Sequence, residues 1–118
     1  MAKDLRISVL LDYYGAMLTE KQRTLVDLYY NQDFSLSEIA ESEGMTRQGA
    51  RDGIKRAESA LCDLEEKLGI VCKAEETAAL SAKIAAAAEK IARLTTDEEI
   101  AKQVKAIKSA AKKISSES

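Results

Sequence analysis

The sequence predicts an all-α protein, and three observations support that fold class. Proline is absent and only five glycines occur in 118 residues, so few positions oppose long helices. Apolar residues make up 46% of the chain but aromatic residues only 4%, so aliphatic side chains must fill the core. The apolar residues recur at intervals of three and four, which is the period of an amphipathic helix. We therefore expect a helical bundle followed by a helical hairpin.

The first two expected helices lie within residues 3–30. The apolar face of the first, over 3–18, should hold a row at four-residue spacing with two residues beside it: Leu5, Val9, Tyr13 and Met17, then Leu10 and Tyr14. Thr19 should cap the second helix, with Gln22 completing a capping box. The apolar face of that helix comprises Leu25, Val26, Leu28 and Tyr29. The segment NQDFS should end it.

A second capping box, Ser35 with Glu38, opens the next helix. Its inward residues should be Leu36, Ile39 and Ala40. Gly44 should end this helix because glycine adopts positive φ at low cost. Met45 should then cover the turn from the apolar side, and Thr46 should cap a helix over 47–68.

The helix over 47–68 has two contrasting faces. Its inward stripe reads Ala50, Ile54, Ala57, Leu61, Leu64 and Leu68. Arg47, Arg51 and Lys55 share another face at four-residue spacing. Gly49 and Gly53 each cost about 1 kcal/mol against alanine inside a helix, so tight packing or a close ligand should compensate. A short helix, a glycine turn and a basic second helix can place a recognition helix in the DNA major groove, although a corner with solvated arginines has the same pattern.

The chain beyond Gly69 differs from the preceding part in the spacing of its apolar residues. Two apolar stripes step by four and three: Leu80, Ile84, Ala87, Ile91 and Leu94, then Ile100, Val104, Ile107, Ala111 and Ile114. Thr96 and Glu99 should form a capping box between them, giving an antiparallel hairpin. We expect a helix-turn-helix domain over 1–70 and a hairpin over 71–118 that forms a homodimer; packing on the preceding helix and a partly disordered appendage remain alternatives.

Several functions are disfavoured by residues that the chain lacks. Without histidine there can be no Ser-His or Cys-His pair, and no phosphate-binding glycine loop occurs, so we expect no enzyme and no cofactor. Cys62 and Cys72 would need carboxylates or a partner chain to complete a zinc site, so we expect free, packed thiols and no metal. The mixed-charge beginning and the lack of a long apolar run predict a cytoplasmic protein without membrane insertion.

Residues 17–70 contain a recognisable set of motifs: LTEKQ, LYY, SLSEIAE, Thr46-Arg47-Gln48, Asp52, IKR at 54–56 and EEKLG. In these motifs the stretch resembles the YlxM-type family of small bacterial helix-turn-helix proteins, which are encoded beside signal recognition particle components. The same stretch more distantly resembles the promoter-recognising C-terminal domain of sigma factors. The resemblance implies a sigma-factor-like helical bundle, nucleic-acid binding and a regulatory role in the signal recognition particle pathway.

These observations predict a DNA-binding regulatory protein. We expect Thr46, Arg47, Gln48 and Arg51 near base edges, and Ser35, Ser37, Lys55 and Arg56 near phosphates. DNA is favoured over RNA as the partner. The alternative is an adaptor that binds a protein or RNA of the signal recognition particle without reading DNA sequence. Residues 1–70 carry nine basic and thirteen acidic side chains, and residues 71–118 carry nine and seven, so any nucleic-acid surface must be local.

Overall fold

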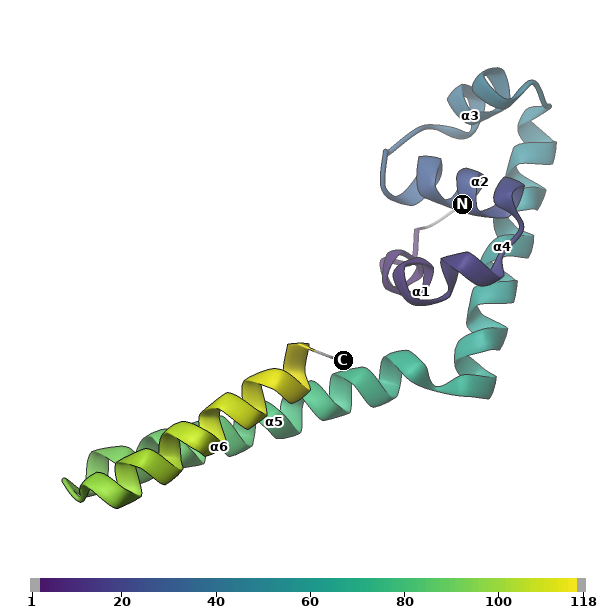
Figure 1. The fold of residues 1–118 in the computed structure, drawn as a ribbon. Helices are drawn as coiled ribbons and strands as arrows, with labels where there is room; N and C mark the ends of the chain where they lie inside the picture. The colour runs from purple at the N-terminus through teal and green to yellow at the C-terminus, as the bar shows by residue number, and fades with distance from the viewer. Residues whose placement is uncertain (1–2, 117–118) are drawn as a thin grey trace. The chain divides into compact units, whose positions relative to one another are not determined.

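The computed structural model describes residues 3–116, and its regular elements are all helices (Figure 1). Their bounds are α1 Arg6–Tyr14, a 3-10 helix Gly15–Met17, α2 Glu20–Tyr30, α3 Leu36–Glu43, α4 Arg47–Leu68, α5 Ile70–Leu94 and α6 Glu98–Ser116. The all-α prediction is confirmed. The chain divides into two compact units, residues 1–71 and residues 72–118.

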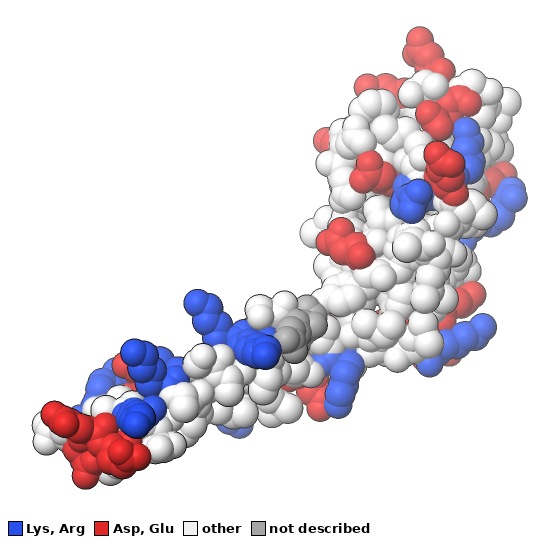
Figure 2. Space-filling model, in the orientation of Figure 1, with Lys and Arg blue, Asp and Glu red and all other residues white. Residues whose placement is uncertain are grey.

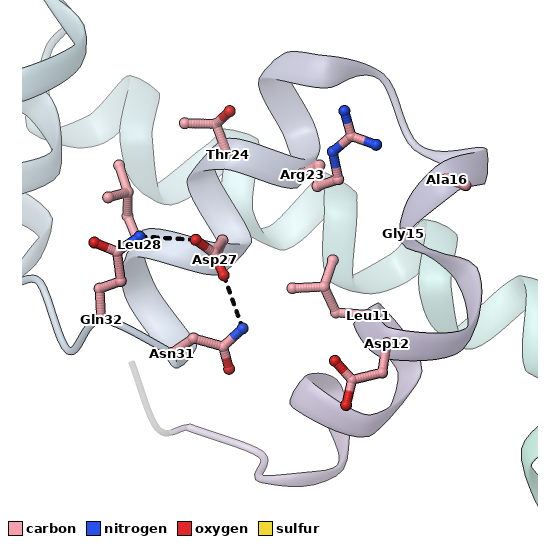
Figure 3. Close-up of a pocket in the computed structure, with 10 residues that line it drawn as sticks. All are labelled: Leu11, Asp12, Gly15, Ala16, Arg23, Thr24, Asp27, Leu28, Asn31 and Gln32. Carbon is pink, nitrogen blue, oxygen red and sulfur yellow. Dashed lines mark hydrogen bonds between the residues drawn. The ribbon is translucent and has the colours of Figure 1, made fainter.

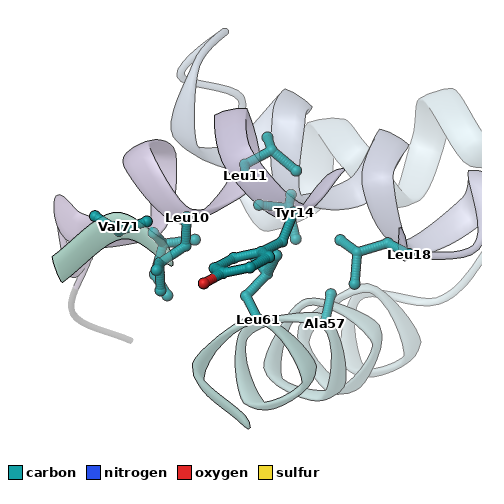
Figure 4. Packing of buried hydrophobic residues seen from close by; sticks show 9 residues of the cluster. Leu10, Leu11, Tyr14, Leu18, Ala57, Leu61 and Val71 are labelled. Atoms are coloured by element: carbon teal, nitrogen blue, oxygen red, sulfur yellow. The ribbon is translucent and has the colours of Figure 1, made fainter. Parts of the chain in front are cut away.

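The first unit is built around α4, which is buried along one side against two groups of residues. Ala57 and Leu61 pack with the residues of α1, whereas Ala50 and Ile54 pack with those of α2 and α3. Figure 4 shows Tyr14 enclosed between α1 and the Leu61 turn of α4. Each large aliphatic side chain buried in this way contributes about 1.5–3 kcal/mol to stability. The expected α4 stripe is therefore buried as far as Leu61.

The inward face of α1 differs from the expected one. The row at four-residue spacing points to solvent, with Leu5 80% and Met17 61% exposed. The buried residues are Leu10 and Tyr14, as expected, together with Ile7 and Leu11. Steps of four drift by about 40° around a helix of 3.6 residues per turn, so a mixture of three- and four-residue steps holds one face better. The helix is also shorter than expected, because the chain tightens into a 3-10 turn at Gly15.

The junction between α4 and α5 is tied to the core by Tyr14. Gly69, at φ +62°, ends α4. The buried Tyr14 hydroxyl donates to Glu65 Oε1 over 2.5 Å and accepts from the Ile70 backbone N–H over 3.0 Å. Glu65 Oε1 also accepts from the Val71 N–H. Burial, followed by the hydrogen bond to the carboxylate, raises the pKa of Tyr14 above its ordinary value. Ile70 and Val71, the last residues of the first unit, are thus tied to its core.

In the second unit, α6 turns back along α5 (Figure 1). The buried positions are Ser81, Ala88, Val104 and Ala111. Most large members of the two apolar stripes are 38% to 85% exposed: Leu80, Ile84, Ile91, Leu94, Ile100, Ile107 and Ile114. The hairpin therefore keeps its bulkiest apolar side chains on its surface.

The turn between α5 and α6 uses a different cap from the one expected. Asp97 Oδ1 accepts from the backbone N–H groups of Glu99 and Ile100 over 2.9 and 3.2 Å. Thr95 Oγ1 accepts from the Asp97 N–H. The expected Thr96–Glu99 capping box is wrong because α6 begins at Glu98, which makes Asp97 the residue that precedes it.

Candidate nucleic-acid interface

The first helix of the predicted reading unit is fixed at both ends by local contacts. Ser35 Oγ accepts from the Glu38 N–H over 3.1 Å, and Glu38 Oε1 accepts from the Ser35 N–H over 3.0 Å. The hydrogen bond from the Ser35 backbone N–H, followed by one from its side chain, holds the pKa of Glu38 below its ordinary value, so the carboxylate stays charged at the helix N-terminus. At the other end, Gly44 has φ +63°. Both expected helix boundaries are confirmed.

The turn into α4 also agrees with the sequence. The Met45 N–H donates to the Ala40 carbonyl over 2.9 Å, and the half-buried Met45 side chain packs on the core beneath α3. Thr46 Oγ1 accepts from the Gly49 N–H over 2.9 Å and caps α4. Since Ile39 is fully buried with Ile54, the two helices are held together by the core as well as by the turn.

The two glycines of α4 have tight surroundings. A Cβ added at Gly53 would lie 2.6 Å from Leu25 Cδ1, a distance that requires one of the two groups to move. At Gly49 it would lie 3.0 Å from Thr46 Oγ1, the atom that caps the helix. Of the two compensations expected for these residues, the structure contains close packing: Gly53 lets α2 approach α4, and Gly49 leaves room for the cap.

All eight predicted site residues are exposed, and five of them surround two neighbouring surface hollows. Ser35, Ser37 and Arg47 line one hollow. Arg47, Gln48 and Arg51 line the other. Leu36 and Arg47 are common to both, so the hollows adjoin at the N-terminal ends of α3 and α4. The structure thereby places serine hydroxyls and guanidinium groups around one concave surface, together with the carboxylates of Asp33 and Glu38.

The remaining predicted residues are placed differently. Thr46 uses its oxygen as the cap of α4. Lys55 and Arg56 lie outside both hollows. Helical periodicity of about 100° per residue keeps Lys55 within about 40° of Arg51 but turns Arg56 a further 100° away. The structure therefore groups Lys55 with the arginine row and separates Arg56 from it.

Polar partners already hold some of these groups. Gln48 Nε2 donates to Asp52 Oδ1 over 2.9 Å, which orients the amide along α4. Arg47, Arg51, Lys55 and Arg56 form no ion pair with any of the residues from 3 to 116. Their charges therefore remain available to an anionic partner.

Acidic residues surround this surface. Glu41 and Asp52 lie in α3 and α4, and Glu43, at the end of α3, is 3.3 Å from Lys21. Figure 2 shows basic and acidic side chains interspersed over the first unit on the face it presents. Since carboxylates repel phosphate, any attraction of this unit for an anionic partner has to come from its few exposed cations.

The structure adds one cation that the sequence did not suggest. Lys3 lines the same hollow as Ser35 and Arg47. Its Nζ lies 2.8 Å from Asp33 Oδ1 and 4.5 Å from the centre of the Tyr29 ring. The ammonium beside it holds the pKa of Asp33 below its ordinary value. Thirty residues separate Lys3 from Asp33, so no local pattern could have found this contact.

A further hollow lies between α1 and α2 (Figure 3). Three of its polar side chains are bonded to each other, since Asp27 accepts from Asn31 Nδ2 and Gln32 Nε2 over 2.8 Å each. These bonds close the C-terminal end of α2. We assign this hollow a structural role.

No group of three or more metal-ligating side chains is arranged around a common point in the described part of the chain. Cys62 and Cys72 are both exposed, so the packing expected for the two thiols is wrong. Within the same residues, no helix is long and apolar enough to cross a membrane.

Comparison with known proteins assigns the chain to a family. Residues 1–107 match the model of the UPF0122 family, described as "Putative helix-turn-helix protein, YlxM / p13 like". The chain belongs to this family. The UPF0122 protein of Thermoanaerobacter sp. strain X514 is 44% identical over 101 residues, which are 86% of each chain. The resemblance to YlxM-type proteins is confirmed.

Two further relatives match mainly in the first unit. The UPF0122 protein of Desulforamulus reducens is 53% identical over 68 residues, which are 58% of each chain. That of Clostridium kluyveri is 52% identical over 71 residues, or 60% of this chain and 64% of its own. These matches span about three fifths of the relatives' length. The family is described by its helix-turn-helix rather than by an enzymatic activity.

Proposed function

We propose that this UPF0122 protein binds duplex DNA as a regulatory protein, with the first turns of α4 in the major groove. The observation that carries the proposal is the division of α4 into two sides. Ala50 and Ile54 are fully buried against α2 and α3, while Arg47, Gln48 and Arg51 line an exposed hollow on the other side. A helix anchored in this way can enter a groove without disturbing the core.

Each predicted residue has a role in this proposal. Arginine can make a bidentate contact to guanine, and glutamine to adenine, so Arg47, Gln48 and Arg51 would face base edges, with Thr46 beside them. The hydroxyls of Ser35 and Ser37, together with Lys55 and Arg56, would contact phosphates. DNA is favoured over RNA because the major groove of B-DNA admits a helix, whereas that of A-form RNA is deep and narrow.

We also propose that the protein acts as a homodimer in the cytoplasm, with residues 71–118 as the oligomerisation segment. The acidic excess of the first unit would make binding by one copy weak. A second copy doubles the phosphate contacts and fixes the spacing of two half-sites. The exposed isoleucines of the hairpin supply an apolar surface for this association.

Substitutions in α4 test the DNA-binding role. Arg47→Ala should reduce discrimination between preferred and other duplexes by about 1–3 kcal/mol in a binding-site selection followed by titration. Lys55→Ala should weaken all duplexes alike and reduce the slope of log affinity against log salt by about one unit. Lys67→Ala, an exposed change in the last turn of the same helix, is the control and should alter neither quantity. Wild-type protein that shows no salt-sensitive binding to any duplex at low ionic strength would contradict the proposal.

A second candidate function follows from the acidic excess of the first unit. In that case the protein is an adaptor that binds a protein or RNA component of the signal recognition particle, and the arginine row is a solvated face. The adaptor role predicts that Arg47→Ala and Arg51→Ala bind isolated signal recognition particle components as wild type does. Measuring this binding beside the duplex titrations separates the two functions.

A further inference from the structure

The strongest concentration of positive charge lies outside the helix-turn-helix, on α6. Residues 100–116 contain five lysines and no acidic side chain: Lys102, Lys105, Lys108, Lys112 and Lys113. The acidic residues nearby precede this stretch, at Asp97, Glu98 and Glu99. Figure 2 shows this separation, with acidic side chains gathered at the turn of the hairpin and basic ones along its length.

Three of the lysines share one side of the hairpin. Lys108 and Lys112 border a shallow groove whose floor is made by Ala82, Ala85 and Ala111. Helical periodicity puts Lys105 within about 20° of Lys112. Lys108 Nζ is paired with Glu89 Oε2 of α5. The hydrogen bond from Lys108 and, to a smaller extent, the charge of Arg93 hold the pKa of Glu89 below its ordinary value, so this carboxylate is already balanced by cations.

The apolar stripes lie on the other side of the hairpin. Relative to the buried Val104 and Ala111, the helical positions of Ile100, Ile107 and Ile114 are turned in one direction and those of Lys105 and Lys112 in the opposite one. A second copy covering the isoleucines would thus leave the lysines exposed.

We propose that Lys105, Lys108 and Lys112, with Arg93, form a second nucleic-acid contact that binds the phosphate backbone without reading sequence. This inference rests on the proposed DNA-binding function. The lysines from 105 to 112 extend over about 10 Å of helix, roughly the rise of three nucleotides of one DNA strand. The groove between them is lined by alanine and serine, whose small side chains let a backbone approach closely.

A lipid surface fits these observations less well. An interfacial helix binds by placing its apolar side chains in the acyl region, with cations near the head groups. Here the side that carries Lys105 and Lys112 presents alanine and serine, and the bulky apolar residues lie on the side proposed for the second copy. A nucleic-acid backbone can bind through cations alone, without apolar side chains beside them. It is therefore the partner that fits the side of the hairpin with Lys105 and Lys112.

The test uses the full chain and a duplex of mixed sequence, titrated between about 50 and 200 mM salt. The variant Lys105→Gln/Lys112→Gln should reduce the salt slope by about two units, because each phosphate contact contributes about 0.9. The matched control is Lys83→Gln/Lys90→Gln, which removes the same charge from the outer side of α5 and should leave the slope unchanged. Circular dichroism of both variants establishes that the hairpin remains helical.

The outcomes separate this inference from the proposed function. Equal slopes for the two variants would overturn the α6 contact, while a loss of sequence preference in Arg47→Ala would still support the major-groove role. A reduced slope only in Lys105→Gln/Lys112→Gln, without any preference that depends on Arg47, would support the α6 contact alone. Binding to anionic phospholipid vesicles that this variant loses, with its duplex slope unchanged, would identify the face as a lipid contact and overturn the inference.

Discussion

The two units of this protein bury different kinds of side chain. The first unit encloses large residues, among them Tyr14, Ile39, Ile54 and Leu61. The hairpin encloses Ser81, Ala88, Val104 and Ala111, while its isoleucines stay exposed. Since apolar stabilisation scales with the area removed from water, the first unit contains its own core and the hairpin has a thin one. From this difference we expect the hairpin to depend on a further surface for its stability more than the helix-turn-helix does.

The largest expected effect comes from the core of the first unit. Ile54→Ala leaves a cavity between α3 and α4 and should lower the free energy of unfolding by about 2–4 kcal/mol, measured by urea denaturation. Ala106→Gly on the exposed side of α6 is the control for a small truncation outside the core, and it should cost only about 1 kcal/mol. An unchanged unfolding transition in Ile54→Ala would show that the helix-turn-helix core is assigned incorrectly.

The apolar face of the hairpin should respond to protein concentration. We expect a dimer by light scattering at tens of micromolar, and a melting temperature that rises with concentration. Ile84→Asp/Ile107→Asp should abolish the dimer and the concentration dependence of the melting temperature, because charged side chains would replace apolar ones at the proposed interface. Lys83→Gln/Lys90→Gln should remain dimeric. A strictly monomeric mass for the wild type would refute the association.

The corrected cap of α6 gives a smaller effect. Asp97→Ala should destabilise the hairpin by about 1 kcal/mol, because it removes the acceptor for two backbone N–H groups. Thr96→Ala should have little effect. Thermal denaturation of the two variants measures the difference. A larger decrease in melting temperature for Thr96→Ala would support the capping box expected from the sequence.

The smallest expected effect is the pH dependence of the hairpin. The Lys108 ammonium holds the pKa of Glu89 below its ordinary value of 4.5. The stabilising contribution is therefore fully present above that value and is lost as pH falls through the lower pKa of the folded state. Both side chains are about half exposed, so water screens the pair. In Lys108→Gln the melting temperature should therefore change less between neutral and acidic pH than it does in the wild type. The same pH dependence in both proteins would show that the ion pair does not contribute to stability.

The candidate site shows how far sequence reasoning reached. The helix boundaries at Ser35, Gly44 and Thr46 were predicted, because each depends on atoms at most a few residues apart. The grouping of Ser35 and Ser37 with Arg47 and Arg51 required the packing of α3 on α4. Lys3 was missed because it comes from a distant part of the chain. The assignment of these residues to DNA stays a prediction.

The sequence by itself determined the helices and most of their ends. A threonine or serine cap and a glycine with positive φ act through local hydrogen bonds, so Thr19, Ser35, Thr46 and Gly69 specify where the chain turns wherever the rest of it lies. The tertiary structure decided which side of each helix became buried. Ile7 rather than Val9 faces the core, and Gly53 meets Leu25, because the inward side depends on neighbours far along the chain. The same holds for the hairpin. Its two amphipathic stripes could be predicted from the sequence, but only the packing of α6 against α5 decided that mostly small residues lie at their contact and that the isoleucines remain on the surface.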